Sequence, residues 1–242
     1  MKISLIGKIL DLMLPRTCAV CGQRLTGSEE MICCSCLLDQ PWVHFWTHPY
    51  DNEMAKLFWH LIPIERCSAL YHHLSHTPSA RPIYQLKYGK RKEMGIFLGE
   101  MLASKGLDTD FFEGIDAIIP IPLAPKREKE RGYNQSLLIA QGISRLTHLP
   151  IIEDAVSRST FQESQTHKNR AERQANVEHV FNLSPHYHDH EGKHSISELA
   201  GKHLLIVDDV CTTGATIISC AHELQQAGKM RFSVLTVGFA HD

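Results

Sequence analysis

Residues 204–216, with the sequence LLIVDDVCTTGAT, combine groups that can bind a phosphorylated sugar. Their apolar start predicts a buried strand, and the small residues after it predict the first turn of a helix. Free N–H groups at the start of a helix bind phosphate, and threonine hydroxyls can donate further hydrogen bonds. Asp208 and Asp209 stand at the end of the strand, where carboxylates can accept hydrogen bonds from sugar hydroxyls. We call this group the cradle and assign to it Asp208, Asp209, Cys211, Thr212, Thr213, Gly214, Ala215 and Thr216.

A plain strand-turn-helix is the alternative interpretation of this segment, with Asp209 or a threonine capping the helix. A cap accounts for one polar residue, whereas the segment has two aspartates and three threonines beside a glycine. The phosphate site is therefore favoured. Cys211 lies beside the phosphate-binding loop and invites a role as a nucleophile, but a small residue that fills space is the simpler interpretation.

Metal-binding chemistry is indicated near the N-terminus, where Cys18 and Cys21 form one C-x-x-C pair and Cys33 and Cys36 form another. Two such pairs can bring four thiolates around one zinc ion, and a segment this small has no other evident source of stability. Cys34 lies within the second pair but does not keep the spacing. A shell of four cysteines leaves no position for a substrate, so we predict structural Zn²⁺.

Strands that alternate with helices must position the cradle. We predict two helical stretches in residues 81–104, broken around Gly89, and helices over 134–147 and 214–227. The order predicts an α/β fold, with a mostly parallel sheet flanked by helices. Ligands bind at the carboxyl ends of such strands, so the loops after Pro120, Val207 and Gly238 are expected to meet there. The predicted strands cover residues 116–122, which run into a proline-closed loop, and 150–152, 203–208 and 232–239.

The composition is that of an ordinary globular protein, with 242 residues of which 43% are hydrophobic and 21% charged. We predict a first segment, residues 1–60, with the zinc knuckle and an aromatic-rich seam, and a main domain, residues 61–242. The formal net charge of −2 excludes a general attraction to nucleic acid or anionic membrane. No apolar run approaches the roughly 20 residues that span a bilayer, and no signal peptide is evident. We therefore expect a cytoplasmic protein, in which cysteines stay reduced.

Three further segments each have two interpretations. Residues 1–14 predict an amphipathic helix, which docks on its own protein or lies peripheral to the inner membrane. The aromatic side chains of residues 41–76 can stack on nucleobases, but a packed seam between knuckle and main domain is favoured. The histidine-rich tract 186–194 can hold metal, but a flexible surface loop is favoured.

The cradle segment matches the signature for 5-phosphoribosyl-1-pyrophosphate (PRPP) in type I phosphoribosyltransferases, and the chain as a whole resembles the ComF (ComFC/GntX) family of bacterial competence and DNA-utilisation proteins. The histidine-rich tract departs from the family pattern. The resemblance implies a type I phosphoribosyltransferase fold with a small N-terminal zinc knuckle. The segments that carry the resemblance are the four cysteines, LKYGK at 86–90, IIPIPLAPKREKERGYNQS at 118–136, the Gln165/Arg170/Asn176 region and DDVCTTGAT.

The same resemblance implies how PRPP binds. The loop after Ile119, through Pro122 and Leu123, would face the pyrophosphate. Residues 157–179 would form a hood over the ligand, with Gln165 and Arg170 among its contacts. Mg²⁺ is expected with PRPP, because the metal neutralises the pyrophosphate and orients it as a leaving group.

Two functions are compatible with a PRPP site. The resemblance implies a protein of natural transformation or DNA utilisation that binds PRPP and single-stranded DNA, with a competence helicase or the DNA-uptake machinery of the inner membrane as candidate partners. The alternative is an active phosphoribosyltransferase, in which a nitrogen acceptor such as a nucleobase or amine displaces pyrophosphate. Candidate DNA contacts are Lys87, Lys90, Arg91, Lys92, Lys126, Arg127, Lys129 and Arg131. A solvated face is the alternative interpretation for the second four, because Glu128 and Glu130 are interleaved with these cations.

Overall fold

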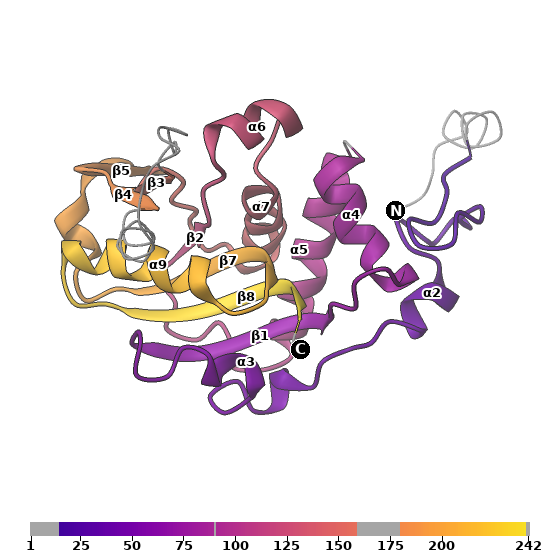
Figure 1. Ribbon diagram of the computed structural model, residues 1–242, viewed down its shortest axis with the longest axis horizontal. Coiled ribbons are helices and arrows are strands. Elements are labelled where there is room, and N and C mark those ends of the chain that lie inside the picture. The colour runs from indigo at the N-terminus through magenta and orange to yellow at the C-terminus, as the bar shows by residue number, and fades with distance from the viewer. Residues whose placement is uncertain (1–14, 90, 159–179, 241–242) are drawn as a thin grey trace, which may run out of the picture.

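The computed structural model describes residues 15–89, 91–158 and 180–240 (Figure 1). Within these ranges a parallel sheet of four strands has the order β1–β8–β7–β2. The central strands are β7 (His203–Cys211) and β8 (Arg231–Phe239), and the edge strands are β1 (Ile64–His72) and β2 (Ala117–Pro120). The predicted α/β fold, with a mostly parallel sheet flanked by helices, is confirmed.

The central strands are apolar on both faces because helices cover both faces. Leu204 and Ile206 of β7 belong to a core layer that contains residues of α9 (Ala215–Leu224) and α3 (Glu53–Lys56). Leu205 and Val207 belong to the opposite layer, with α5 (Lys92–Leu107) and α7 (Gln135–Thr147). The alternation along one strand therefore fixes which helices lie on each side of the sheet.

Helices α5 and α7 pack together where each has a glycine. A Cβ atom on Gly99 would clash with the carbonyl oxygen of Ile139, and one on Gly142 would clash with that of Ile96. The close approach leaves no room for a larger residue at either position. It fixes the position of α7, whose first turn lies beside the end of β7.

The N-terminal knuckle, residues 15–40, lies at one end of the molecule beside α4 (Arg81–Tyr88) (Figure 1). It contains α2 (Cys34–Leu38). The Arg81 guanidinium donates a hydrogen bond to the carbonyl oxygen of Val20, and Gln85 Nε2 donates to that of Ala19 at 3.1 Å. Helix α4 therefore joins the knuckle to the sheet domain.

Strand β1 and helix α6 are among the elements that the sequence did not predict. Strand β1 occupies part of the stretch 41–76, for which the sequence predicts an aromatic seam. Trp42 does lie at such a seam, where its Nε1 donates to the carbonyl oxygen of Leu37 at 3.2 Å. Helix α6 (Pro125–Arg131) replaces the loop predicted after β2. Its sequence, PKREKER, has no apolar periodicity, and only Pro125 in its first turn and Gly132 just after it mark its ends.

The histidine-rich tract is not a flexible loop but a hairpin of β5 (His186–Asp189) and β6 (Gly192–Ser195), which pair antiparallel. Residues 150–152 form an isolated bridge, Ile151 with Ile118, rather than a full strand. Strands β3 (Val156–Arg158) and β4 (Phe181–Leu183) pair antiparallel and flank most of the predicted hood. Short 3₁₀ turns cover Phe45–Thr47, Pro78–Ala80, Ile196–Leu199 and Gln225–Ala227.

Some predictions fall on residues outside the described ranges. These are the amphipathic helix 1–14 and the hood residues 159–179. The division of the chain at residue 60 stays a prediction. In the described ranges, no helix combines the length and the apolar character needed to cross a membrane.

Candidate functional site

The cradle lies where β7 ends and α9 begins, as its sequence predicts. Gly214 caps α9 with φ of 74°, a left-handed conformation that favours glycine, and a Cβ atom there would lie 2.8 Å from the buried ring of Phe58. Thr212, Thr213 and Ala215 are exposed beside a hollow of about 40 Å³. The first turn of α9 thus presents its N–H groups to solvent, where an anion can bind them.

Asp208 is held at the end of β7 by two hydrogen bonds. The Ser136 hydroxyl donates to its Oδ1 at 2.9 Å, and the backbone N–H of Asp209 donates to the same oxygen at 2.8 Å. Burial and the neighbouring Asp209 charge nevertheless raise the pKa of Asp208 to about 7. Asp208 therefore titrates near neutral pH, unlike an ordinary aspartate.

Asp209 forms an ion pair with Lys87 of α4, at 2.9 Å between Oδ1 and Nζ. Both side chains are largely shielded from solvent, with 13% and 25% of their surface exposed. The assignment of Lys87 to DNA stays a prediction, and the structure brings this side chain to the cradle. The pair spans the gap between the carboxyl edge of the sheet and α4, so α4 belongs to the site.

The RGYNQS segment, residues 131–136, ties three parts of the site together. The Tyr133 hydroxyl donates to the carbonyl oxygen of Leu86 in α4 at 2.7 Å, and Asn134 Nδ2 donates to that of Ile121 after β2 at 3.0 Å. Asn134 also caps α7, and Ser136 reaches Asp208. Sequence reasoning missed Asn134 and Ser136 as site residues, although an Asn at the start of a predicted helix is a signal for a cap.

The remaining residues predicted to bind PRPP, together with Cys211 of the cradle, differ in their positions. Pro122 and Leu123 are half-buried in the segment after β2, next to the end of β7. The Cys211 side chain is buried, and burial together with the Asp208 charge raises the pKa of its thiol to about 12, so only its backbone can face a ligand. Gln165 and Arg170 lie outside the described residues.

Arg158, at the end of β3, adds a cation near the cradle. Its guanidinium lies 5.4 Å from the centroid of the Phe181 ring. Burial and the Arg127 charge lower the pKa of Arg158, and the Asp208 charge opposes that shift. The start of the predicted hood therefore lies within electrostatic reach of both α6 and the cradle.

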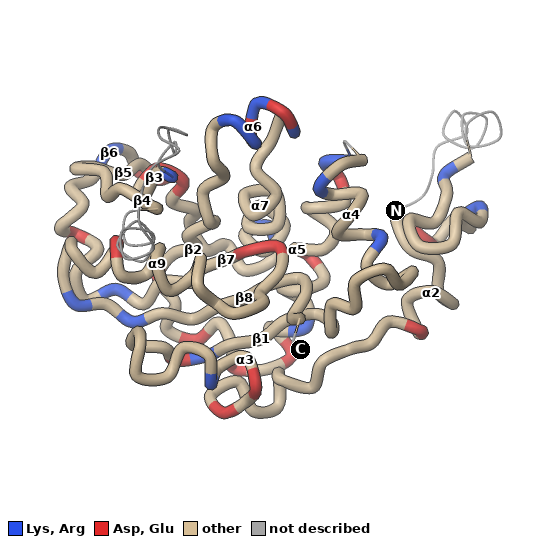
Figure 2. Tube along the Cα trace, in the orientation of Figure 1, with Lys and Arg blue, Asp and Glu red and all other residues tan. Residues whose placement is uncertain are grey.

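The predicted DNA contacts separate into engaged and exposed side chains. Arg91 donates to Gln85 Oε1 at 3.1 Å and approaches the Met31 sulfur of the knuckle, so it belongs to the docking contact. Lys92 lies over the Tyr133 ring, 5.5 Å from its centroid. Lys90 lies outside the described residues. The cations of α6 are exposed or half-exposed above the acidic end of β7 (Figure 2): Lys126, Arg127, Lys129 and Arg131.

The four predicted cysteine ligands converge. The sulfur atoms of Cys18, Cys21, Cys33 and Cys36 all lie within 4.8 Å of one another and could hold a metal ion. Burial opposes ionisation of Cys18, but the N–H groups of Cys21, Cys33 and Val20 lower its pKa to about 6. Burial and the other three thiols raise the pKa of Cys36. A cation would resolve this conflict, because it stabilises all four thiolates.

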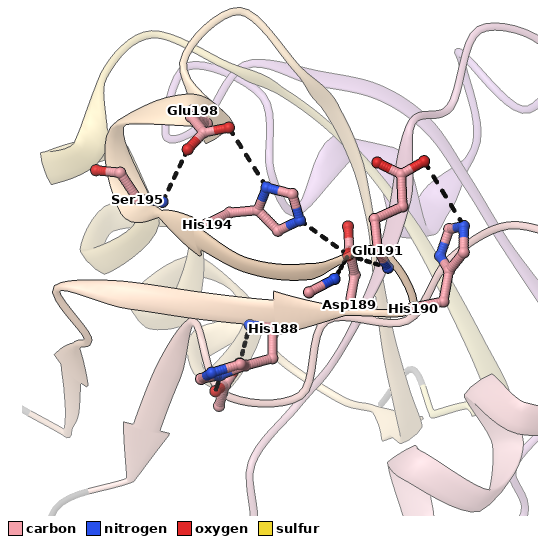
Figure 3. Close-up of polar contacts among 9 residues, drawn as sticks. His188, Asp189, His190, Glu191, His194, Ser195 and Glu198 are labelled. Atoms are coloured by element: carbon pink, nitrogen blue, oxygen red, sulfur yellow. Dashed lines mark hydrogen bonds and ion pairs between the residues drawn. The ribbon is translucent and has the colours of Figure 1, made fainter.

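The histidine hairpin is ordered by acidic partners (Figure 3). His194 lies between Asp189, at 3.0 Å, and Glu198, at 3.4 Å, and its ring stacks on Tyr187. Desolvation disfavours the protonated ring, but the two carboxylates outweigh it and raise the pKa of His194. In the ranges that the structure describes, the four cysteines are the only group of three or more histidine, cysteine, aspartate or glutamate side chains that converges on one point.

Comparisons with known proteins find a matching family model and several similar proteins. A family model described as "Phosphoribosyl transferase domain" matches residues 135–239. DNA utilization protein YhgH of Escherichia coli (strain K12) is 29% identical over 215 residues, which are 87% of this chain and 85% of YhgH. Competence protein F of Haemophilus influenzae is 32% identical over 47% of this chain and 45% of its own. Competence protein ComFC of Bacillus subtilis is 34% identical over 46% of this chain and 39% of its own.

A solved structure, that of Leishmania donovani UMP synthase, covers 70% of this chain and 28% of its own length. Its identity is 16% and its TM-score is 0.34, too low to carry an argument.

The raised pKa of Asp208 predicts how stability depends on pH. Between the ordinary pKa of 3.8 and about 7, the folded protein keeps a proton on Asp208 that the unfolded chain has released. The free energy of unfolding therefore falls as pH rises through this window. The Asp208→Asn variant has no such proton to lose. The difference in free energy of unfolding, variant minus parent, should therefore increase by at least about 1 kcal/mol from pH 5 to pH 8.

Urea unfolding at the two pH values measures the change. Asp108→Asn, which alters an exposed carboxylate after α5, serves as the control and should keep the pH dependence of the parent. Equal pH dependence in the Asp208→Asn variant and the parent would show that Asp208 titrates normally.

Proposed function

The chain belongs to the ComF family and carries a phosphoribosyltransferase domain, and from this premise we propose that it binds PRPP and handles single-stranded DNA in natural transformation or DNA utilisation. Relatives named for competence and for DNA utilization support the biological role. The observation that carries PRPP binding is the cradle, in which two carboxylates at the end of β7 directly precede an exposed helix N-terminus. Few ligands other than a sugar phosphate match both halves of that arrangement.

Each part of the cradle suits one part of PRPP. The N–H groups of the first turn of α9, with the hydroxyls of Thr212 and Thr213, suit the 5-phosphate. Asp208 and Asp209 suit the vicinal hydroxyls of the ribose, which would compete with the Lys87 ammonium for Asp209. The loop at Pro122, on the neighbouring strand, suits the pyrophosphate. Proposed hood contacts are Gln165 and Arg170.

Mg²⁺ is proposed to enter with the ligand. Asp208 is already bonded to Ser136, and Asp209 is paired with Lys87, so the cradle carboxylates have partners before any metal arrives. Pyrophosphate, by contrast, carries charge that a divalent ion neutralises. We therefore assign Mg²⁺ to PRPP rather than to a preformed protein site.

Transfer of the phosphoribosyl group to a nitrogen acceptor is the second candidate, favoured by the domain match. In that reaction the bond from C1 of the ribose to nitrogen forms as the bond from C1 to the pyrophosphate oxygen breaks. Positioned charge and exclusion of water suffice, and no covalent intermediate is needed. Cys211 is unsuited as a nucleophile because its buried thiol stays protonated. Release of pyrophosphate with a panel of nucleobases and amines distinguishes this enzyme from a binding protein.

Single-stranded DNA is proposed to meet the exposed cations of α6. Lys87 and Arg91 are engaged within the protein, whereas Lys126, Arg127 and Lys129 are exposed. Phosphates of a strand could pair with these three side chains without breaking a hydrogen bond or ion pair to another described residue. A competence helicase and the inner-membrane uptake machinery remain proposed partners, and the cytoplasm, including its membrane face, remains the proposed location.

Structural Zn²⁺ is proposed for the knuckle. The convergence of Cys18, Cys21, Cys33 and Cys36 fits the four-coordinate site that zinc prefers. The ion would contribute folding energy to a segment that is otherwise small, and it would leave no position for substrate.

Removing the cradle carboxylates tests PRPP binding. Asp208→Asn with Asp209→Asn should weaken PRPP binding at least about tenfold, because hydrogen bonds to charged groups contribute about 1.5–3 kcal/mol each. Calorimetry with PRPP and Mg²⁺ measures the affinity. The matched control, Asp108→Asn with Asp110→Asn, removes two exposed carboxylates and should bind like the parent. Unchanged affinity in the cradle variant would contradict the assignment.

Serine substitutions test the zinc site. The purified protein should contain about one zinc per chain, and Cys36→Ser should lower that content and destabilise the knuckle. Cys34→Ser is the matched control, since Cys34 is exposed and stands outside the converging group. Elemental analysis gives the metal content. Equal zinc loss in both variants, or a folded knuckle without metal, would be evidence against the site.

Salt dependence tests the DNA contacts. Glutamine at Lys126, Arg127 and Lys129 should flatten the slope of log affinity against log salt by up to about 2, at ~0.7 per neutralised phosphate of a single strand. The control carries glutamine at Lys202, Lys229 and Arg231, three exposed cations at the amino ends of β7 and β8. Filter binding of an oligothymidylate gives both slopes. The same slope in the two variants would place the DNA elsewhere.

A further inference from the structure

Helix α4 presents two tyrosines that the fold does not bury. The apolar residues of α4 that face the core are Pro82, Ile83 and Leu86. Tyr84 and Tyr88 lie on the opposite side, 65% and 60% exposed, one helical turn apart. Their rings stay close together, with centroids 4.8 Å apart. More than half of each side chain is open to water, so both rings are available to a ligand.

The tyrosines stand beside hollows lined by cations. Among the described residues, a groove of about 430 Å³ between α4 and α6 is lined by Tyr88 and Tyr133 together with Lys87, Arg127, Arg131 and one carboxylate, that of Glu130. A second hollow of about 380 Å³ lies on the side of Tyr84 and also includes Lys87. The Arg131 guanidinium lies over the Tyr88 ring, 5.3 Å from its centroid. Aromatic faces and positive charges therefore alternate along this surface.

We propose that this surface, which we call the tyrosine groove, binds single-stranded nucleic acid by stacking unpaired bases on Tyr84 and Tyr88 while the surrounding cations meet the phosphates. The inference rests on the proposed DNA role and adds to it the residues that recognise bases. Every base has a flat π face, so stacking on tyrosine needs no particular sequence. Paired bases in a duplex are stacked on one another and cannot present that face.

The charges of the groove agree with this occupant. Arg127 and Arg131 line it and are set against Glu130, so the surface is cationic despite the net charge of −2 of the chain. An acidic peptide would match the cations but would leave the tyrosine rings in water. A strand of nucleic acid uses both, since its phosphates and bases alternate with a spacing that a row of aromatic and cationic side chains can follow.

An abasic strand separates base stacking from phosphate contact. Fluorescence anisotropy compares a labelled oligothymidylate with an abasic strand of the same length, which keeps the phosphates and lacks the bases. The intact protein should bind the oligothymidylate at least about tenfold more tightly. Duplex DNA of the same length should bind no better than the abasic strand.

Substitutions then assign that preference to the groove. Tyr84→Ala with Tyr88→Ala should bring the affinities for the two strands to within about twofold, while Tyr84→Phe with Tyr88→Phe keeps the preference because the rings remain. Tyr50→Ala is the matched control and should also keep the preference. Tyr50 is 50% exposed with the Arg66 guanidinium 5.8 Å from its ring centroid, but it does not line the groove. PRPP affinity, measured by calorimetry, should stay unchanged in all three variants.

The outcomes distinguish this inference from the proposed function. Equal binding of both strands by the intact protein, or a preference that survives loss of both rings, would overturn base stacking and leave PRPP binding and phosphate contact standing. Binding of neither strand would overturn the DNA role and the groove together. The comparison on the intact protein does not depend on whether a variant folds.

Discussion

Two aspartates side by side at the end of a buried strand are the constraint from which the rest of this site follows. Carboxylates of Asp208 and Asp209 repel each other, and burial disfavours charge on Asp208. A hydroxyl from α7 donates a hydrogen bond to Asp208, and an ammonium from α4 forms an ion pair with Asp209. Both partners must arrive from elements far away in the sequence, so the positions of these two helices are tied to the strand end that they serve.

Helix α4, which has eight residues, contacts the knuckle, the cradle and the segment before α7. Arg81 and Gln85 of this helix donate hydrogen bonds to the knuckle, and Lys87 near its C-terminus pairs with Asp209 of the cradle. The carbonyl oxygen of Leu86 also accepts a hydrogen bond from Tyr133. Because these contacts lie on one helix, the knuckle and the cradle share α4 as a common support. The knuckle can thus matter to ligand binding without touching the ligand.

Local signals made much of this protein predictable. The cradle and the cysteine pairs are contiguous in sequence, so residue type and spacing sufficed to identify them, and strongly apolar strands such as β7 predicted the parallel sheet. Helix α6 was missed because it packs no apolar face. Strand β1 was missed because a run that includes Glu65, Arg66 and Ser68 lacks a clear apolar pattern. The partners of the aspartates, Ser136 and Lys87, lie 72 and more than a hundred residues away, and no local pattern encodes such contacts.

The ion pair between Lys87 and Asp209 also connects the two proposed binding surfaces. Lys87 lines the tyrosine groove, so its ammonium is shared between a carboxylate of the cradle and the charge of the groove. Sugar hydroxyls that bond to Asp209 release part of the hold on that ammonium and raise the positive potential of the groove. A phosphate that attracts the ammonium into the groove likewise leaves Asp209 freer to accept hydroxyls. If both surfaces bind the ligands proposed for them, this one ion pair would let PRPP and a nucleic-acid strand strengthen each other's binding, because coupling between two ligands is reciprocal.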